Sequence, residues 1–274
     1  MQNNLKICFI GGGNMAQALI GGLANKLTAA SNIHVVDVNP DALAALSSQF
    51  GVQTSSAPGS EVAAADVLVL AVKPQQMREV ASSLAPQIRA QLVLSIAAGI
   101  RAADLSRWLN GHQAIVRTMP NTPALIGKGV TGMTASAGVT PEQRETADAI
   151  LRAVGQTVWL EDESQLDAVT AISGSGPAYV FYFLEAMQQA AVDLGLTAEQ
   201  GYALALATFT GASALAEQST ESASVLRERV TSKGGTTYAA ITSMQDAGVG
   251  EAIATAMHAA AKRSREMGDE FGKG

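Results

Sequence analysis

The sequence predicts an α/β protein in which a doubly wound, mostly parallel sheet is followed by an all-helical domain. Three observations lead to this class. An apolar run, Ile7 to Ile10, is followed at once by a glycine-rich turn and a helical pattern, which is the layout of a strand–turn–helix unit. Similar runs alternate with helical patterns as far as Leu160. Beyond Glu161 the chain is rich in alanine without a strand pattern, so we expect domains at 1–161 and 162–274.

Composition narrows the classes of function. The chain has 274 residues, of which 47% are hydrophobic and 15% charged, as expected for a globular protein with a substantial core. Its formal net charge of −6 argues against nucleic acid as the main partner, because phosphate binding needs clustered lysine and arginine. No apolar run reaches membrane-spanning length, and the N-terminus lacks the layout of a signal peptide. We therefore expect a cytoplasmic protein with no membrane contact.

The cysteine and histidine content does not favour a metal site. Cys8 is the single cysteine and lies inside the first predicted strand, which indicates a buried thiol and excludes an intrachain disulfide. The three histidines, His34, His112 and His258, are scattered without the spacing of metal ligands. We predict no bound metal.

The glycine-rich turn carries the most informative single motif. The spacing Gly11-x-Gly13-x-x-Ala16 is the dinucleotide fingerprint of a Rossmann-type sheet, with alanine in its third place. Gly11 allows the tight turn, Gly13 lets backbone N–H groups reach a pyrophosphate, and Ala16 lets the helix lie close to the strand. A plain βαβ turn without a nucleotide is the alternative. The residues of this turn that we assign to the cofactor are Gly11, Gly12, Gly13, Asn14 and Met15.

An acidic residue stands where a dinucleotide would place its adenosine ribose. The second strand-like run, Ile33 to Val36, ends in Asp37, about twenty residues after the fingerprint. Asp37-Val38-Asn39-Pro40 contains no lysine or arginine for a 2′-phosphate, and an acidic residue would repel one. Either NADH is used well, or Asn39 and neighbouring N–H groups bind the phosphate while Asp37 points away. We therefore predict NADPH or NADH as cofactor, contacted by Asp37 and Asn39.

Three later turns also follow strand-like runs, and in open α/β sheets this edge binds ligands. Lys73-Pro74 ends the run Asp66 to Val72, and small residues at Ala97-Ala98-Gly99 leave room for a flat ring. Asn121, in a loop stiffened by prolines, offers the donor and acceptor that a carboxamide needs. Ordinary loop chemistry is the alternative for each turn. The residues assigned to the cofactor here are Ala71, Val72, Lys73, Pro74, Ala97, Ala98 and Asn121.

The helical domain has two informative interruptions. Two glycines and a proline interrupt a helical pattern between Ser173 and Tyr179. These residues destabilise a helix, so we expect the backbone here to lie close to a ligand or to another part of the chain. At Ser232 to Thr237 a glycine turn opens a helix whose first-turn N–H groups and hydroxyls suit a carboxylate. Simple capping by threonine is the alternative. The small, apolar helix surfaces suggest that one face is buried against another subunit.

Together these motifs resemble those of the pyrroline-5-carboxylate reductases, the last enzymes of proline biosynthesis. The resemblance covers nearly the whole chain, in the family's order. The segments that carry it are Ile10 to Ala16, Ala71 to Pro74, Ser95 to Gly99, Met119 to Ala124, Ser173 to Tyr179 and Ser232 to Thr237.

The resemblance implies transfer of a hydride from NAD(P)H to the C=N carbon of 1-pyrroline-5-carboxylate, which gives L-proline. It implies that the N-terminal domain holds the cofactor and that the helical domain forms a homodimer, often assembled further into a ring of dimers. On the family pattern, Thr237 hydrogen-bonds the ring nitrogen. The residues that would bind the substrate are Ser175, Ser232, Gly235, Thr236 and Thr237.

Two departures from the family pattern and three alternatives remain. Family members usually favour NADPH, whereas Asp37-Val38-Asn39-Pro40 has no lysine or arginine for a 2′-phosphate. Lys233 stands where the family commonly has proline, and it adds a positive charge near the expected carboxylate. Another cyclic imine reductase would use the same chemistry with a different carboxylate pocket. A hydroxyacid dehydrogenase of the same two-domain plan would need a lysine, and none occurs between Lys128 and Lys233. A nucleotide-sensing protein without turnover is the non-enzymatic alternative.

Overall fold

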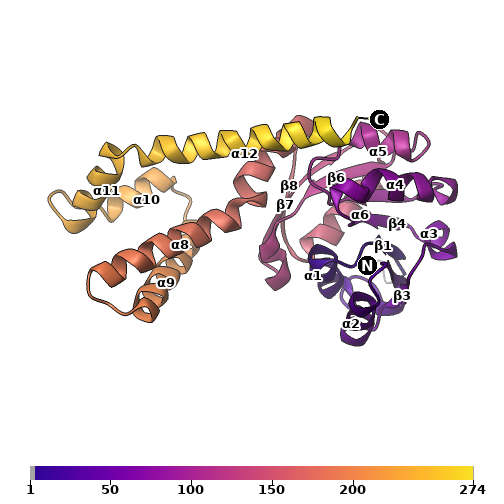
Figure 1. Ribbon diagram of the computed structural model, residues 1–274, viewed down its shortest axis with the longest axis horizontal. Coiled ribbons are helices and arrows are strands. Elements are labelled where there is room, and N and C mark those ends of the chain that lie inside the picture. Colours follow the sequence, from indigo (N-terminus) through magenta and orange to yellow (C-terminus); the bar gives the residue numbers. More distant parts are fainter. Residues whose placement is uncertain (1–3, 274) are drawn as a thin grey trace. The chain divides into compact units, whose positions relative to one another are not determined.

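The computed structural model describes residues 4–273, which divide into two compact units (Figure 1). Unit 1 holds the described residues as far as Ser175 together with those from Ala259 onward, and unit 2 is Gly176–His258. The sequence-based boundary at 161/162 follows the change in composition. The compact units divide later, because residues 162–175 and the end of the last helix pack with the sheet.

Unit 1 is built on one eight-stranded sheet with the order β3-β2-β1-β4-β5-β6-β7-β8. Neighbouring strands are parallel except for β6 and β7, so the prediction of a mostly parallel sheet is confirmed. The central strands are buried along their whole length, as in sheets covered on both faces. The strands are β1 (Ile7–Ile10), β2 (Ile33–Val36), β3 (Gln53–Ser55), β4 (Val67–Leu70), β5 (Leu92–Ser95), β6 (Ile115–Met119), β7 (Gly129–Ala135) and β8 (Gly155–Trp159).

Helices between the strands cover the two faces of this sheet. Successive residues of β1 face opposite sides, so Phe9 packs with Leu19 in one core cluster and Cys8 with Met77 in the other. The helices are α1 (Asn14–Leu23), α2 (Pro40–Phe50), α3 (Ser60–Ala64), α4 (Pro74–Leu84), α5 (Ala102–Trp108), α6 (Pro141–Arg152) and α7 (Leu166–Val169). Shorter turns are η1 (Ala30–Asn32), η2 (Ala85–Gln87), η3 (Thr122–Ile126), η4 (Glu163–Gln165) and the π turn η5 (Thr170–Gly174).

The end of α12 (Val249–Phe271) belongs to unit 1 and packs against the turn that follows β5. Gly99 has φ +72°, and a Cβ there would lie 2.9 Å from the Cβ of Met267. The Ser264 hydroxyl donates to an Asp167 carboxylate oxygen at 2.6 Å, which ties the helix to α7. The packing of α12 against Gly99 therefore excludes any residue with a side chain at this turn.

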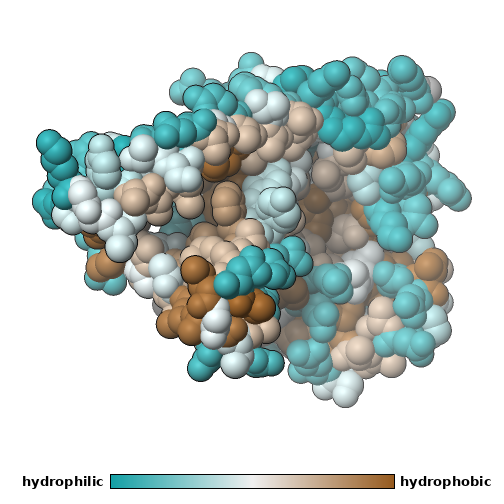
Figure 2. Space-filling view, turned by 60° about the vertical axis from the view of Figure 1, so that its left-hand side comes forward, coloured by the Kyte–Doolittle hydropathy of each residue, from teal (hydrophilic) through white to brown (hydrophobic). Residues whose placement is uncertain are grey.

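Unit 2 consists of helices with few buried side chains. Helices α8 and α9 pack against one another and lie side by side in Figure 1. Phe181 is 63% exposed, Tyr182 71% and Leu204 59%. Hydrophobic residues also gather in an exposed patch on the face shown in Figure 2. A surface this apolar needs a partner. The helices, besides the first part of α12, are α8 (Gly176–Asp193), α9 (Ala198–Glu217), α10 (Ala223–Arg229) and α11 (Thr236–Asp246).

A buried ion pair should make Glu163 important for the stability of unit 1. The Arg117 side chain is 8% exposed and its guanidinium lies 3.0 Å from Glu163, which also accepts the Ala102 N–H at 2.7 Å. Glu163→Ala leaves a buried charge unpaired and should lower the free energy of unfolding by roughly 3 kcal/mol. Glu266→Ala removes two exposed ion pairs, with Lys262 and Arg263, and should cost below about 1 kcal/mol. Urea unfolding measures both, and equal losses would contradict this account.

Candidate cofactor and substrate site

The turn between β1 and α1 has a backbone that only glycine adopts readily. Gly11 has φ +106°, and a Cβ there would lie 2.6 Å from the carbonyl oxygen of Ala71, at the end of β4. Its N–H donates to the Val36 carbonyl at 2.8 Å, so the turn is fastened to the ends of two neighbouring strands. Close packing behind Gly11 therefore sets the direction in which α1 begins.

The start of α1 is open. Gly13 is its N-cap residue, and a Cβ built on Gly13 would meet nothing within 4 Å. No side chain caps the helix in the described part of the chain, and its first turn holds no acidic residue. Ala16 is fully buried, so α1 packs closely on the sheet. Free N–H groups at a helix N-terminus, with open space before them, suit a pyrophosphate.

Asp37 lies directly beside this turn. One carboxylate oxygen of Asp37 accepts the Gly12 N–H at 2.6 Å, and the other accepts the Asn39 N–H at 2.8 Å. Sequence spacing placed Asp37 at the end of β2 but missed its bond to Gly12, which depends on the side-chain rotamer. The carboxylate thus joins the glycine turn to the start of α2.

The other predicted cofactor residues follow neighbouring strands at the same edge of the sheet. Ala71–Pro74 follow β4, Ala97 and Ala98 follow β5, and Asn121 follows β6. Because β2, β1, β4, β5 and β6 are adjacent and parallel, their carboxyl ends form one continuous edge. Lys73 is exposed and precedes α4, whose first residue is Pro74.

Asn121 has a structural task as well. It is buried, its Nδ2 donates to the Ser173 carbonyl at 3.1 Å, and its Oδ1 accepts the Val130 N–H at 2.9 Å. These bonds tie the loop after β6 to β7 and to the π turn η5. One lone pair of Oδ1 and one N–H of Nδ2 are used within the fold, which leaves the second lone pair and the second N–H for a carboxamide. That contact stays a prediction.

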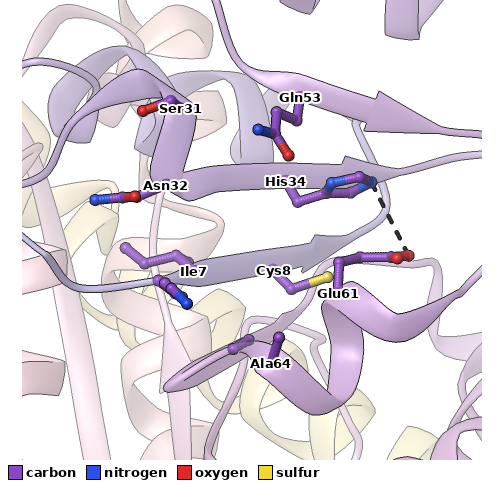
Figure 3. A pocket seen from close by; sticks show the side chains of 10 residues that line it. Ile7, Cys8, Ser31, Asn32, His34, Gln53, Glu61 and Ala64 are labelled. Atoms are coloured by element: carbon purple, nitrogen blue, oxygen red, sulfur yellow. Dashed lines mark ion pairs between the residues drawn. The ribbon is translucent and has the colours of Figure 1, made fainter.

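Another polar pocket lies beside α3, away from the glycine turn (Figure 3). His34 and Glu61 point toward one another at 3.9 Å, and His34 is within 2.9 Å of the Ser55 hydroxyl. Cys8 lies beside this cluster, and burial, together with the charge of Glu61, raises the pKa of its thiol to about 12. A thiol that stays protonated at neutral pH is no nucleophile. Among the described residues, no group of histidine, cysteine and carboxylate side chains could hold a metal ion.

In unit 2 the predicted substrate residues gather at the start of α11. Gly234 has φ +76°, Gly235 is the N-cap residue, and Thr236 and Thr237 are the first two residues of the helix. Neither threonine caps it, since within the described residues no side-chain cap hydrogen bond is made. Simple capping, the alternative in the sequence analysis, is therefore not what the threonines do here. Their exposed positions leave the helix end open to an anion.

Ser175 lies in unit 1, at the end of the π turn η5. Its N–H donates to the Thr170 carbonyl at 2.9 Å, the i→i−5 bond of a π turn. Gly174 is required by close packing, because a Cβ there would lie 2.5 Å from Met119 Cε. Pro177 falls in the first turn of α8, where its missing N–H costs nothing. The glycines and the proline thus build a bulge instead of breaking a helix.

Comparison with known proteins identifies the family. Residues 163–267 match the model described as pyrroline-5-carboxylate reductase dimerisation, and residues 6–99 match the model of NADP oxidoreductases, coenzyme F420-dependent. The pyrroline-5-carboxylate reductase of Pseudomonas aeruginosa is 45% identical over 98% of this chain and 98% of its own length. The chain belongs to the pyrroline-5-carboxylate reductase family.

Solved structures of pyrroline-5-carboxylate reductases share the whole fold. The Coxiella burnetii reductase is similar with a TM-score of 0.90 and 39% identity, covering 97% of this chain and 99% of its own. The Plasmodium falciparum pyrroline carboxylate reductase, solved with NADP bound, has a TM-score of 0.87 and 28% identity, covering 97% and 99%. The Rossmann-type sheet and the helical region that were predicted from the sequence are both confirmed.

A pair of glycine substitutions should separate folding from cofactor binding. Gly11→Ala forces a positive φ on alanine and a clash with Ala71, and it should lower the free energy of unfolding by about 2 kcal/mol or more. At Gly13→Ala the new methyl group meets no other part of the described chain within 4 Å, so stability should change by less than about 1 kcal/mol. NAD(P)H affinity should fall because the methyl group occupies the open space. Thermal unfolding and fluorescence titration measure the two effects. Equal stability losses would contradict the assignment.

The buried Cys8 thiol should be unreactive in the native protein. Since its pKa is raised to about 12, almost no thiolate exists at pH 8. Iodoacetamide at that pH should label the urea-unfolded chain fully and the native chain hardly at all, as followed by mass spectrometry. Rapid labelling of the native chain would show that the thiol is accessible and ionised.

Proposed function

We propose that this chain reduces 1-pyrroline-5-carboxylate to L-proline with NAD(P)H, the last step of proline biosynthesis. The observation that carries the proposal is the full-length match to pyrroline-5-carboxylate reductases, at up to 45% identity. Each of the two reactants, the cofactor and the substrate, has a matching feature in this chain. An open glycine turn stands at the start of α1, and an uncapped glycine turn opens α11.

The cofactor, when bound, supplies the hydride. The uncapped start of α1 fits its pyrophosphate, with Gly11, Gly12, Gly13, Asn14 and Met15 around it. The turn at Ala97 and Ala98, which has small side chains, would border the nicotinamide ring. The residues after β4 would contact the part of the cofactor between its pyrophosphate and its nicotinamide ring. These are the chain's contributions to cofactor binding: a positive helix end, space without side chains, and a rigid sheet edge.

The substrate contacts are proposed from the family pattern and from the geometry of α11. The N–H groups of Gly235, Thr236 and Thr237 would bind the carboxylate together with the Ser232 hydroxyl, since oriented amides at a helix start favour an anion. Ser175 would contact the substrate as well. A protonated imine is already electrophilic, so hydride addition to carbon yields the amine directly. Thr237 would hold the ring nitrogen in place by a hydrogen bond while water is excluded.

The assembly proposed is a homodimer, or a ring of such dimers. The exposed apolar side chains of unit 2, such as Phe181 and Leu204, support a second copy as the partner, and the matched dimerisation model covers this region. We assign cofactor binding to residues 1–161, and substrate binding and dimerisation to 162–274. The matched model begins at residue 163, which supports this division.

We place the reaction in the cytoplasm, where reduced nicotinamide cofactors are available. In the described residues no helix has both the length and the apolar character that a membrane span requires. The hydroxyacid dehydrogenase alternative still lacks its lysine, since none occurs between Lys128 and Lys233. Another cyclic imine as substrate is the alternative that an assay must exclude.

The direct test is an absorbance assay at the reduced-nicotinamide band. Addition of 1-pyrroline-5-carboxylate to the protein with NADPH, and in parallel with NADH, should oxidise at least one of them and form proline. Other cyclic imines without a carboxylate serve as controls and should turn over much more slowly. Cofactor binding without turnover on 1-pyrroline-5-carboxylate would overturn the proposed reaction.

Thr237 should matter for turnover and not for the cofactor. Thr237→Ala removes the hydroxyl proposed to hold the ring nitrogen and should lower kcat on the order of 10²-fold, a typical contribution of one positioned proton-bearing group. NAD(P)H affinity should stay within a few-fold. Thr237→Ser keeps the hydroxyl and should retain most of the activity. If Thr237→Ala turns over like the wild type, Thr237 has no part in the mechanism.

A further inference from the structure

From Asn39 to Leu43, the segment after β2 uses its backbone N–H donors within the chain. Pro40 has no N–H, and the N–H of Leu43 donates to the Asn39 carbonyl at 3.2 Å. The Asn39 side chain caps α2, because its Oδ1 accepts from Asp41 at 3.0 Å and Ala42 at 3.4 Å. Together with the bond from the Asn39 N–H to Asp37, this occupies the N–H groups from Asn39 to Leu43.

Asp37 itself is held in place by two bonds. The Gly12 N–H lies 2.6 Å from one carboxylate oxygen and the Asn39 N–H lies 2.8 Å from the other. Turning the side chain away would break both bonds and leave the Gly12 N–H without its acceptor. The carboxylate therefore remains next to the glycine turn, where the adenosine ribose of a dinucleotide comes to lie.

The chain segment around Asp37 supplies no lysine or arginine to offset its charge. The chain has no lysine or arginine between Lys26 and Lys73, and Asp41 adds a second carboxylate to the start of α2. His34 lies beside α3 and faces Glu61 (Figure 3), and it also contacts the Ser55 hydroxyl. Lys73 follows β4, which is two strand spacings, roughly 10 Å, from β2.

We propose that Asp37 makes this chain select NADH over NADPH. The ribose hydroxyls of NADH can donate to the free lone pairs of a carboxylate whose position is already set. The 2′-phosphate of NADPH would meet the same carboxylate as a like charge, with no backbone N–H group from Asn39 to Leu43 left to bind it. The sequence left two interpretations open: either Asp37 faces the ribose, or it points away while Asn39 and neighbouring N–H groups bind a phosphate. The geometry favours the first. The inference rests on the proposed cofactor binding at the glycine turn.

Binding of the two cofactors, without substrate, tests the proposal. Fluorescence titration of NADH and of NADPH should show tighter binding of NADH, by on the order of tenfold or more. Asp37→Ser should weaken the binding of NADH, strengthen the binding of NADPH and reverse the ratio of the two affinities. Asp66→Asn is the matched control: it removes one negative charge at the amino end of β4 and should leave the ratio unchanged.

A second variant, Val38→Arg, tests the proposal without changing Asp37, in case Asp37→Ser does not fold. Val38 is 86% exposed, so Val38→Arg should fold normally and add a cation for the 2′-phosphate. With Asp37 intact, this variant should raise the affinity for NADPH on the order of tenfold and leave the affinity for NADH largely unchanged. Equal or tighter binding of NADPH by the wild type, or an unchanged ratio in folded Asp37→Ser, would overturn the selection while leaving the reductase proposal in place. Binding of neither cofactor would overturn both.

Discussion

The positive φ of Gly11 is the constraint on which the site depends. The chain must leave β1, pass within van der Waals contact of the Ala71 carbonyl and begin α1 immediately, and only a residue without a side chain can do so. This turn points the free N–H groups of α1 into open space at Gly13. It also brings the Gly12 N–H to the Asp37 carboxylate. Anion binding and ribose recognition are thus two consequences of one backbone conformation.

Burial explains why the chemistry lies at strand ends and helix starts. The central strands are apolar and fully covered, so they position loops without contributing functional groups of their own. Unit 2 has the opposite character, because large side chains such as Phe181 and Tyr182 are exposed on α8. A helical unit with so little core of its own depends on association, which agrees with the matched dimerisation model. The reductase is therefore expected to work as an assembly of subunits.

The sequence predicted the regular elements well and the local contacts poorly. The bounds of β1 and β2 agree with the apolar runs, since buried parallel strands are read directly from hydrophobicity. Helices α3 and α5 have only five and seven residues, too few for a helical period to stand out in the sequence. The hydrogen bonds of Asp37 and Asn121 depend on rotamers and on residues far apart in the chain, which spacing does not encode. The compact units differ from the compositional boundary because packing decides them, and residues 162–175 pack on the sheet.

Isotope transfer tests the central claim most directly. The account predicts that NAD(P)H carrying deuterium at both positions of C4 of the nicotinamide ring will transfer one deuterium to the former imine carbon of 1-pyrroline-5-carboxylate. Mass spectrometry and NMR of the product should then find one deuterium per proline at that carbon in ordinary water. Proline without deuterium, or deuterium taken up only when the solvent is D₂O, would contradict direct hydride transfer at this site.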